Sequence, residues 1–428
     1  MKYQETTDKD SSVLRVYLSR VRAFKPNARY YLLSVTLSGI TIGVFRLLFN
    51  FYVLSLGYDE ALLGNLITTS NMTALLVALP MGYLVDLWGR KQALIVQSTL
   101  LVGAIVVMSL WPDVTVFYLM NAVTGLAMSV GSVASGPFLM ENSGETERTY
   151  LFSFSSGLQM ASMFAGNWVG GYLPTWIGAY RMVDPESSTA YAGALLIVGL
   201  VGVFSLVPLL FIRAAKSGDV RDNVFAPITF ARENPKLLGK LFVPLLLISV
   251  GAGLFVPFMN VFFRVVHHQP DTVIGSLMAW GSLAMGIGLL IAPPIADRIG
   301  KLRLVVVTQG LSIPFMIMLG FVPVFAISTM AYYVRMALMN MSNPIYQSFV
   351  LEQVDPSSRA TVASLHSMIW SFGRAFSPSI SGSLQVAYGF GPPFAIAISL
   401  YAAAILLYWL FFLRRSADKP VTIQAARK

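Results

Sequence analysis

The chain has 428 residues, of which 56% are hydrophobic and 12% are charged. A soluble domain carries about twice that share of charge, and one bilayer crossing takes about 20 apolar residues. The high apolar content excludes a soluble enzyme and a disordered chain. Because no cysteine is present, a disulfide scaffold is excluded as well. The composition predicts an all-α membrane protein that crosses the bilayer many times.

The first segment, residues 1–28, is polar and no cleavage pattern follows it, so it does not read as a signal peptide. Apolar residues recur at helical spacing between Leu14 and Phe24, with arginines beside them. This pattern predicts a short amphipathic helix on the inner leaflet, and an unstructured basic tail is the alternative.

Twelve apolar runs follow, and each is expected to be a transmembrane helix. They lie roughly at 30–56, 61–85, 92–111, 115–140, 151–174, 190–212, 239–264, 272–296, 304–324, 326–350, 363–386 and 391–413. The longest polar connection separates the sixth run from the seventh. The predicted units are a cytoplasmic N-terminal segment (1–28), a six-helix bundle (29–213), a cytoplasmic linker (214–237), a second six-helix bundle (238–414) and a cytoplasmic tail (415–428).

Basic residues are concentrated in the two tails and in alternate loops, whereas the opposite loops hold only Arg181 and Arg264. By the positive-inside rule, both termini are then cytoplasmic. This topology accounts for the net charge of +10, so we expect no nucleic-acid partner. The predicted location is the plasma membrane, which in a bacterium is the inner membrane.

The two halves repeat each other. Gly43-Val-Phe-Arg-Leu-Leu-Phe-Asn50 aligns with Gly253-Leu-Phe-Val-Pro-Phe-Met-Asn260 at an offset of 210. An offset of 211 then pairs Gly64 with Gly275, Asp86 with Asp297, Gly89 with Gly300, Arg90 with Lys301, Glu141 with Glu352, Arg148 with Arg359 and Gly171 with Gly382. Parallel repeats of this kind are typical of secondary transporters, in which the substrate binds between the halves near the midplane.

The loop after the second run reads Gly82-Tyr-Leu-Val-Asp86-Leu-Trp-Gly89-Arg90-Lys91, with a shorter copy in the second half at Asp297-Arg298-Ile-Gly300-Lys301. It resembles the signature G-x-L-a-D-r-x-G-r-k of the major facilitator superfamily (MFS). With twelve spans and a central linker, the resemblance covers nearly the whole chain. It implies the MFS fold, two pseudo-symmetric six-helix bundles, and alternating access by a rocker-switch motion.

The signature also implies roles for its residues. A tight turn between two helices needs the backbone freedom of Gly89 and of Gly300 in the copy. The resemblance further implies two gating charge clusters that hold the inner side closed. One comprises Asp86, Arg90 and Glu141, and the other Asp297, Lys301 and Glu352. The alternative is that these are loop charges that only set topology.

Two further patterns depart from those of drug/proton antiporters. Gly166-Asn167-Trp-Val-Gly-Gly171 resembles the antiporter motif G-P-x-x-G-G, but Asn167 replaces the proline. Close packing of small residues is the favoured interpretation. Asn121 stands where many proton-coupled antiporters carry an arginine. Both departures count against an antiporter of that kind.

Only three charged residues lie well inside the predicted spans: Arg46, Arg335 and Arg374. A charge inside a membrane helix faces a cavity or a partner by default, and no carboxylate of the sequence reaches the midplane. Guanidinium suits a carboxylate or a phosphate, so we infer that the substrate supplies the counter-charge. The alternative is that each arginine binds free carbonyls at a helix kink or a structural water.

Asn50 and Asn260 hold equivalent positions one turn beyond Arg46 and its repeat partner. They are expected either to bind the substrate or to bridge helices. The predicted substrate-binding set is therefore Arg46, Asn50, Asn260, Arg335 and Arg374. Because no acid lies inside the spans, we predict weak dependence of transport on a pH gradient.

The sequence thus predicts a secondary transporter of a small or amphiphilic organic anion. The alternatives are a polyspecific efflux pump for lipophilic drugs and, more remotely, a non-transporting receptor on the same scaffold. No motif of a metalloprotease, a nucleotide site or a serine hydrolase is present, so no catalytic residue, metal or cofactor is expected. The expected partners are the substrate and the lipid bilayer, and we expect a monomer.

Overall fold

A computed structural model describes residues 24–144, 147–213, 232–355 and 358–414. Within these ranges the chain is almost entirely helical and contains no strand. The predicted amphipathic helix, most of the linker and the C-terminal tail lie outside the described residues. The elements are α2 (Pro26–Ser55), α3 (Glu60–Trp88), α4 (Arg90–Leu110), α5 (Val114–Glu141), α6 (Arg148–Arg181), α7 (Ser188–Val203), α8 (Leu206–Leu210), α10 (Pro235–Phe255), η1 (Val256–Phe258), α11 (Met259–Val265), α12 (Asp271–Ile299), α13 (Lys301–Phe321), α14 (Phe325–Glu352), α15 (Arg359–Tyr388), α16 (Gly391–Tyr408) and η3 (Trp409–Leu413).

Nine helical segments of the described chain are long and apolar enough to cross a bilayer. The long helices that do not reach this apolarity are α6, α14 and α15, with 34, 28 and 30 residues. Their length is ample for a crossing. α6 and α14 contribute several polar side chains to a central cavity described below, whereas α15 contributes Arg374 and uses Ser379 and Ser381 in hydrogen bonds to α3 and α10. The prediction of an all-α, multi-spanning membrane protein is confirmed.

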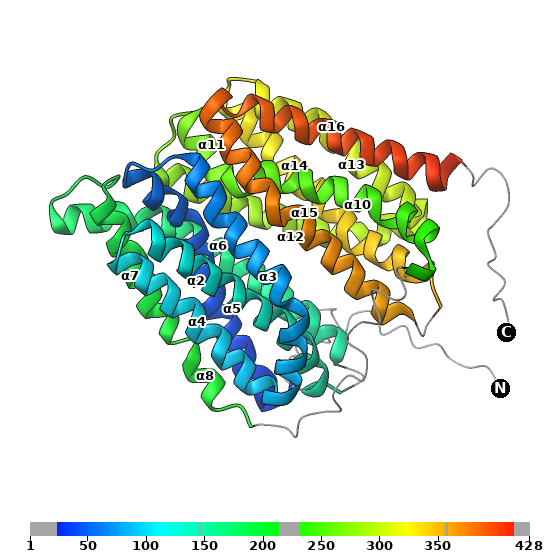
Figure 1. Ribbon diagram of the computed structural model, residues 1–428, viewed down its shortest axis with the longest axis horizontal. Helices are drawn as coiled ribbons and strands as arrows, with labels where there is room; N and C mark the ends of the chain where they lie inside the picture. The colour runs from blue at the N-terminus through cyan, green and yellow to red at the C-terminus, as the bar shows by residue number, and fades with distance from the viewer. Residues whose placement is uncertain (1–23, 145–146, 214–231, 356–357, 415–428) are drawn as a thin grey trace, which may run out of the picture.

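The helices form two bundles (Figure 1). In the first, α2 packs on α6 and α7, and α5 packs on α3 and α4; in the second, α10 packs on α15 and α16, and α14 packs on α12 and α13. The bundles meet along two helix pairs, α3 with α15 and α6 with α12. They diverge toward the end where α8 stops and α10 starts, which we call the linker end. We call the opposite end, which includes α11, the far end.

The turn between α3 and α4 and its repeat between α12 and α13 have the same backbone conformation. Each consists of one glycine in the left-handed region, Gly89 with φ +86° and Gly300 with φ +93°. Residues that carry a Cβ atom rarely adopt a positive φ, so both turns require glycine. This confirms the prediction made from the repeated motif.

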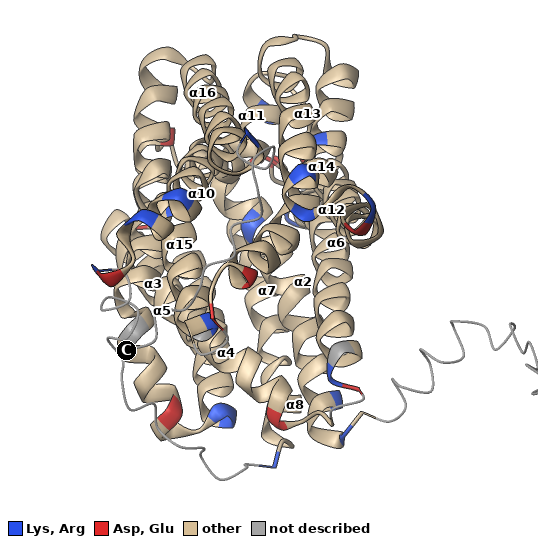
Figure 2. Cartoon of the chain, turned by 90° about the vertical axis from the view of Figure 1, so that its right-hand side faces the viewer, with Lys and Arg blue, Asp and Glu red and all other residues tan. Residues whose placement is uncertain are grey.

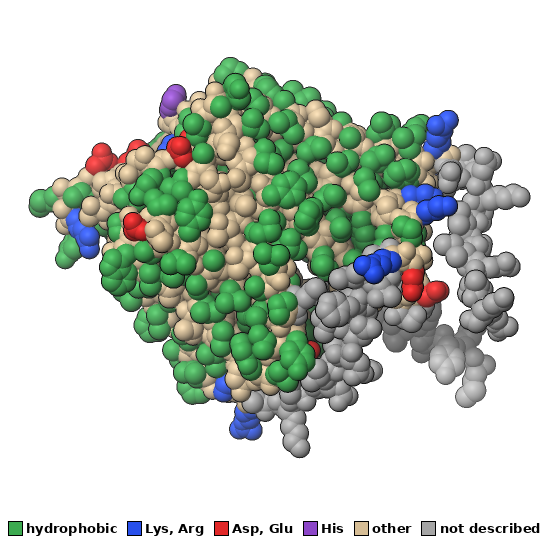
Figure 3. Space-filling model, viewed as in Figure 1, with side chains coloured by type: hydrophobic (Ala, Val, Ile, Leu, Met, Phe, Trp, Pro, Cys, Tyr) green, Lys and Arg blue, Asp and Glu red, His purple; other side chains and the backbone are tan. Residues whose placement is uncertain are grey.

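The outer surface of the bundles suits lipid. Large hydrophobic side chains are exposed on both bundles and are spread over the face seen in Figure 3. Long stretches of the helices carry no charged residue (Figure 2). An apolar surface of this extent is stable only against hydrocarbon or another apolar partner.

Candidate substrate site

A cavity of about 700 Å³ lies between the two bundles. Its lining extends to Tyr31, Leu94 and Leu209, which lie toward the linker end, so the cavity opens in that direction. Among the described residues, the lining contains three arginines and no aspartate, glutamate, lysine or histidine. The cavity is therefore an electropositive site whose charges have no protein counter-charge.

The two bundles line the cavity with different chemistry. The first bundle contributes small hydroxyl and amide side chains, including Ser34, Ser38, Ser70, Asn71, Gln97, Ser98, Ser132, Ser135, Ser155 and Gln159, and nearly as many apolar ones, among them Ile42, Phe45, Phe49, Met128 and Met163. The second contributes methionines and aromatic rings: Met259, Met278, Met285, Met336, Met339, Phe255, Tyr332, Trp370 and Tyr401. Flexible thioethers adapt to apolar groups of varied shape. The second bundle also contributes Asn260, Ser282, Asn340 and Asn343, so both walls combine polar and apolar groups, and the second is richer in methionines and rings.

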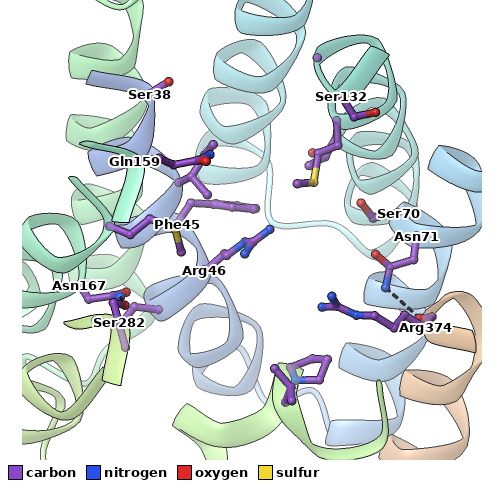
Figure 4. A pocket seen from close by; sticks show the side chains of 18 of the residues that line it. Ser38, Phe45, Arg46, Ser70, Asn71, Ser132, Gln159, Asn167, Ser282 and Arg374 are labelled. Carbon is purple, nitrogen blue, oxygen red and sulfur yellow. Dashed lines mark hydrogen bonds between the residues drawn. The ribbon is translucent and has the colours of Figure 1, made fainter. Parts of the chain in front are cut away.

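Arg46 on α2 and Arg374 on α15 point into the cavity from opposite bundles, toward each other (Figure 4). Arg46 is exposed to the cavity, and Arg374 is half-buried with its guanidinium 5.9 Å from the centre of the Trp370 ring. Asn71 donates a hydrogen bond of 3.1 Å to the backbone oxygen of Arg374. Within the described chain, neither guanidinium has an acidic partner.

Arg335 on α14 lines the same cavity but is almost fully buried, with 4% of its surface exposed. Its guanidinium carbon lies 4.4 Å from the centre of the Phe255 ring and 5.1 Å from that of Tyr401. Its Nε and Nη2 are buried without a hydrogen-bond partner. The faces of the two rings therefore provide the electrostatic partner of this charge.

Asn50 and Asn260 form a reciprocal bridge between the bundles. Asn50 Nδ2 donates to Asn260 Oδ1 and to the backbone oxygen of Pro257, both at 2.8 Å, and Asn260 Nδ2 donates to the backbone oxygen of Leu47 at 2.8 Å. Leu47 and Pro257 are themselves repeat equivalents at the offset of 210. Both asparagines border the cavity, but their amides serve helix bridging, which favours that interpretation over substrate contact.

A polar cluster that we did not predict joins the bundles at the far end. Arg264 forms an ion pair with Asp271, its Nη2 donates to Tyr191 Oη at 2.6 Å, and its guanidinium carbon lies 3.8 Å from the centre of the Phe51 ring. Tyr191 Oη donates to Asp271 Oδ2 at 2.6 Å. Glu186 lies 3.8 Å from the guanidinium. The only sequence signal was the isolated position of Arg264 among loops poor in basic residues.

Four glycines allow the bundles to touch backbone to backbone. A Cβ atom at Gly64, Gly171, Gly275 or Gly382 would collide with a backbone oxygen of the other bundle. The four oxygens belong, in that order, to Pro378, Asp271, Asn167 and Glu60. The two seams, α3 with α15 and α6 with α12, are thus related by the repeat offset of 211. The interpretation of the small-residue motif as close packing is confirmed.

The structure brings most of the predicted gating charges together at the linker end. In the first bundle Arg90 forms an ion pair with Asp86, and its Nε lies 3.4 Å from Glu141 Oε1. In the second, Lys301 forms an ion pair with Glu352. Asp297 is exposed and has no ion pair within the described chain. Each cluster lies within one bundle, so their role in gating stays a prediction.

Residues 31–378 and 246–428 match the family model described as the Major Facilitator Superfamily. The chain belongs to this superfamily. Its predicted fold class is thereby confirmed. It is a multi-pass membrane transporter, not an enzyme, and members of this superfamily bind small-molecule substrates within the membrane.

Curated relatives of the chain carry the name multidrug resistance protein MdtG. The protein from Dickeya zeae (strain Ech586) is 22% identical over 355 residues, covering 80% of this chain and 82% of its own length. The protein from Klebsiella pneumoniae (strain 342) is 22% identical over 348 residues, covering 79% of each.

Solved structures share the fold at low sequence identity. The nucleoside transporter NupG has a TM-score of 0.73 at 14% identity, covering 90% of this chain and 98% of its own. A bacterial homologue of the human lysosomal transporter Spinster, described as inward-facing and occupied, has a TM-score of 0.72 at 15% identity, covering 90% and 97%. The xylose transporter XylE from E. coli, described as partially occluded and inward open, has a TM-score of 0.68 at 14% identity, covering 90% and 99%.

Proposed function

We propose that the chain transports a small or amphiphilic organic anion, carrying a carboxylate or phosphate, by rocker-switch alternating access. The observation that carries this proposal is the facing pair Arg46 and Arg374, which point into one cavity whose described lining holds no acid. An uncompensated charge at membrane depth is costly and marks a substrate path. A bound anion would supply the missing counter-charge to two forked hydrogen-bond donors.

The methionines and aromatic rings of the cavity lining support an amphiphilic substrate. An anionic group between Arg46 and Arg374 would leave the rest of the molecule close to the methionines and rings of the second bundle. Burial of apolar surface against that wall would add affinity without demanding one shape. Arg335 lies on the same side of the cavity, and the rings of Phe255 and Tyr401 cover its guanidinium. We propose that this guanidinium contacts the anion only at the edge of the two rings.

We further propose that the linker end and both termini face the cytoplasm, because the basic residues gather in those segments. In this conformation the cavity would then be open to the cytoplasm. Two of the similar structures are described as inward-facing or inward open, which supports this assignment. The proposed moving units are residues 29–213 and 238–414 of a monomer in the inner membrane, with 1–28, 214–237 and 415–428 outside the bundles.

A second candidate is a polyspecific efflux pump for lipophilic drugs, with the arginines in structural roles. The names of the curated relatives favour it, as does the wall rich in methionine. The two candidates differ in the charge of the ligand they prefer. That difference can be measured without knowing the natural substrate.

The deciding experiment is a thermal unfolding assay of the purified protein with two ligands of matched ring size, 1-naphthyl phosphate and 1-naphthylmethylammonium. A ligand that binds the folded state raises the unfolding temperature by mass action. We expect the phosphate to stabilise the protein selectively. Arg46→Gln and Arg374→Gln should each abolish that selectivity, while Arg303→Gln, an exposed arginine outside the cavity lining, should retain it.

Selective stabilisation by the ammonium ligand, with no effect of either cavity substitution, would instead support the efflux pump. Equal stabilisation by the phosphate in the parent and in both cavity variants would overturn the anion site, even if the protein binds anions elsewhere.

A further inference from the structure

We propose that this transporter is an obligatory anion exchanger, in which the empty carrier does not reorient and each half-cycle requires a bound anion. This inference rests on the proposed function, because it takes Arg46 and Arg374 as the anion site. It adds the mode of transport, which neither the fold nor the relatives specify.

The argument starts from what compensates the two charges in the open state. Arg46 is exposed to the cavity and Arg374 is half-buried, so water in the open cavity solvates both guanidinium groups. Closing the linker end removes that water and lowers the local dielectric constant. Two like charges that point toward each other would then lose their solvation and repel each other more strongly.

No charged group in the described lining can neutralise the two guanidinium groups once the water is lost. The lining holds no carboxylate, so no internal ion pair can form on closure, and no histidine or lysine whose deprotonation could lower the net charge. Asp271 and Glu186 flank Arg264 at the far end and do not line the cavity. An anion between Arg46 and Arg374 removes both penalties, and closure then proceeds.

Arg335 provides an internal comparison, because its charge is already out of water. Only 4% of this residue is exposed in the open state, and the rings of Phe255 and Tyr401 cover the guanidinium. Closure changes its surroundings little. The barrier to closing the cavity without a bound anion therefore comes from Arg46 and Arg374, and Arg335 adds little to it.

The test measures access to the cavity from each face of the membrane and needs no substrate. The chain has no cysteine, so Met128→Cys introduces a single thiol. Met128 lies midway along α5, lines the cavity and is 40% exposed. In sealed vesicles in chloride buffer, a membrane-impermeant maleimide is added from one face or the other, with Met182→Cys, 95% exposed at the far end, as the marker of that face.

We expect the Met128→Cys protein to react from the linker face only. Adding Arg46→Gln and Arg374→Gln should lower the barrier to reorientation of the empty carrier. The labelling rate from the far face should then rise about tenfold or more. Adding Arg303→Gln, an exposed arginine outside the cavity lining, should instead leave labelling one-sided. The single variants Arg46→Gln and Arg374→Gln, each with its unfolding temperature recorded, replace the double variant if that protein does not fold.

Comparable labelling of the Met128→Cys protein from both faces without an organic anion would overturn obligatory exchange. One-sided labelling of every folded variant that carries Arg46→Gln or Arg374→Gln, or equal acceleration by Arg303→Gln, would also overturn it. These outcomes are separable from failure of the proposed function. Selective stabilisation by 1-naphthyl phosphate together with two-sided labelling leaves an anion transporter that is not an exchanger.

Discussion

The amides of Asn50 and Asn260 each complete a hydrogen bond to a backbone oxygen of the other bundle, and one amide also binds the other. Both residues are buried, with 5% of their surface exposed. The bridge lies directly beyond the cavity, on the side that is closed in this conformation. The bridge therefore links α2 to α11 at the closed far end, and its two asparagines also border the substrate site.

Replacing Asn50 with alanine is expected to lower the free energy of unfolding by about 1–3 kcal/mol, because buried carbonyl and amide groups lose their partners. Asn260→Ala should cost a similar amount. The double variant should lose less than the sum of the two single losses, since both substitutions break the same bridge. Chemical unfolding in detergent measures all three variants, and strictly additive losses would contradict a shared bridge.

His267 lies in the loop between α11 and α12, against the rings of Phe262, Phe263 and Phe325. Burial, and secondarily the neighbouring His268, lower the pKa of His267 below its usual value. The unfolded chain therefore takes up this proton at a higher pH than the folded chain, so folding stability is lost as the pH falls.

We expect the unfolding temperature to fall between about pH 7.5 and pH 5.5, across the ordinary histidine pKa of about 6.5. His267→Phe keeps an aromatic ring in the cluster and removes the titrating group, so the decline should become shallower. An identical decline in the parent and in His267→Phe would assign the pH dependence to other groups.

At the scale of residues, the sequence alone identified Arg46, Arg335 and Arg374 as candidate site residues, because an isolated charge in an apolar run is conspicuous. It could not show that ring faces cover Arg335, since Phe255 and Tyr401 come from other helices. The cluster around Arg264 escaped prediction for the opposite reason. Charges at span ends are ordinary, and only the packing of the bundles shows that this one is shared between them.

Among the elements, the seams of α3 with α15 and of α6 with α12 hold the far end closed. Their helices approach so closely that a methyl group at Gly171 would meet the backbone oxygen of Asp271 at 2.7 Å. Backbone cannot yield to such a contact as a flexible side chain does. The seam must therefore open or shift when its glycine is replaced.

Gly171→Ala is expected to reduce the free energy of unfolding by about 1–3 kcal/mol through overpacking. Gly382→Ala, its repeat equivalent, should have a comparable effect. Gly103→Ala on α4 is the matched control, because a Cβ there meets no atom within 4 Å. Unfolding temperatures compare the three, and equal values for Gly171→Ala and Gly103→Ala would show that the seam tolerates a methyl group.

Helix positions followed from apolarity, but interruptions within spans did not. The seventh span breaks into α10, η1 and α11 around Pro257, and the sixth into α7 and α8 near Ser205. Proline removes one backbone donor, which permits a break but does not require one. Hydrophobic periodicity reports which residues face lipid, so it does not resolve such local changes of helical geometry.

For the whole molecule, the described cavity lacks any carboxylate or histidine that could carry a proton with the substrate. We therefore expect transport to depend weakly on a pH gradient. The measurement is uptake of 1-naphthyl phosphate into proteoliposomes preloaded with the same compound, with and without an imposed gradient. A strong acceleration by the gradient would show that a proton-binding group outside this lining drives transport.

The repeat and the MFS motif predicted the fold of the whole chain, including both glycine turns. They did not predict which end is open, because one sequence must be compatible with every conformation of a transport cycle. The closed far end is seen only in the contacts between the bundles, such as the hydrogen bond from Tyr191 to Asp271.

The glycine seams and the asparagine bridge occur in both repeats, whereas the charges in the cavity occur once. The seams are duplicated at an offset of 211 and the asparagine bridge at 210, but the equivalents of Arg46, Arg335 and Arg374 are Val256, Thr124 and Met163. The contacts between the bundles and the charged residues of the cavity can therefore change independently in evolution. A descendant of this chain could acquire a new cargo by single substitutions at unpaired positions while inheriting its moving parts unchanged.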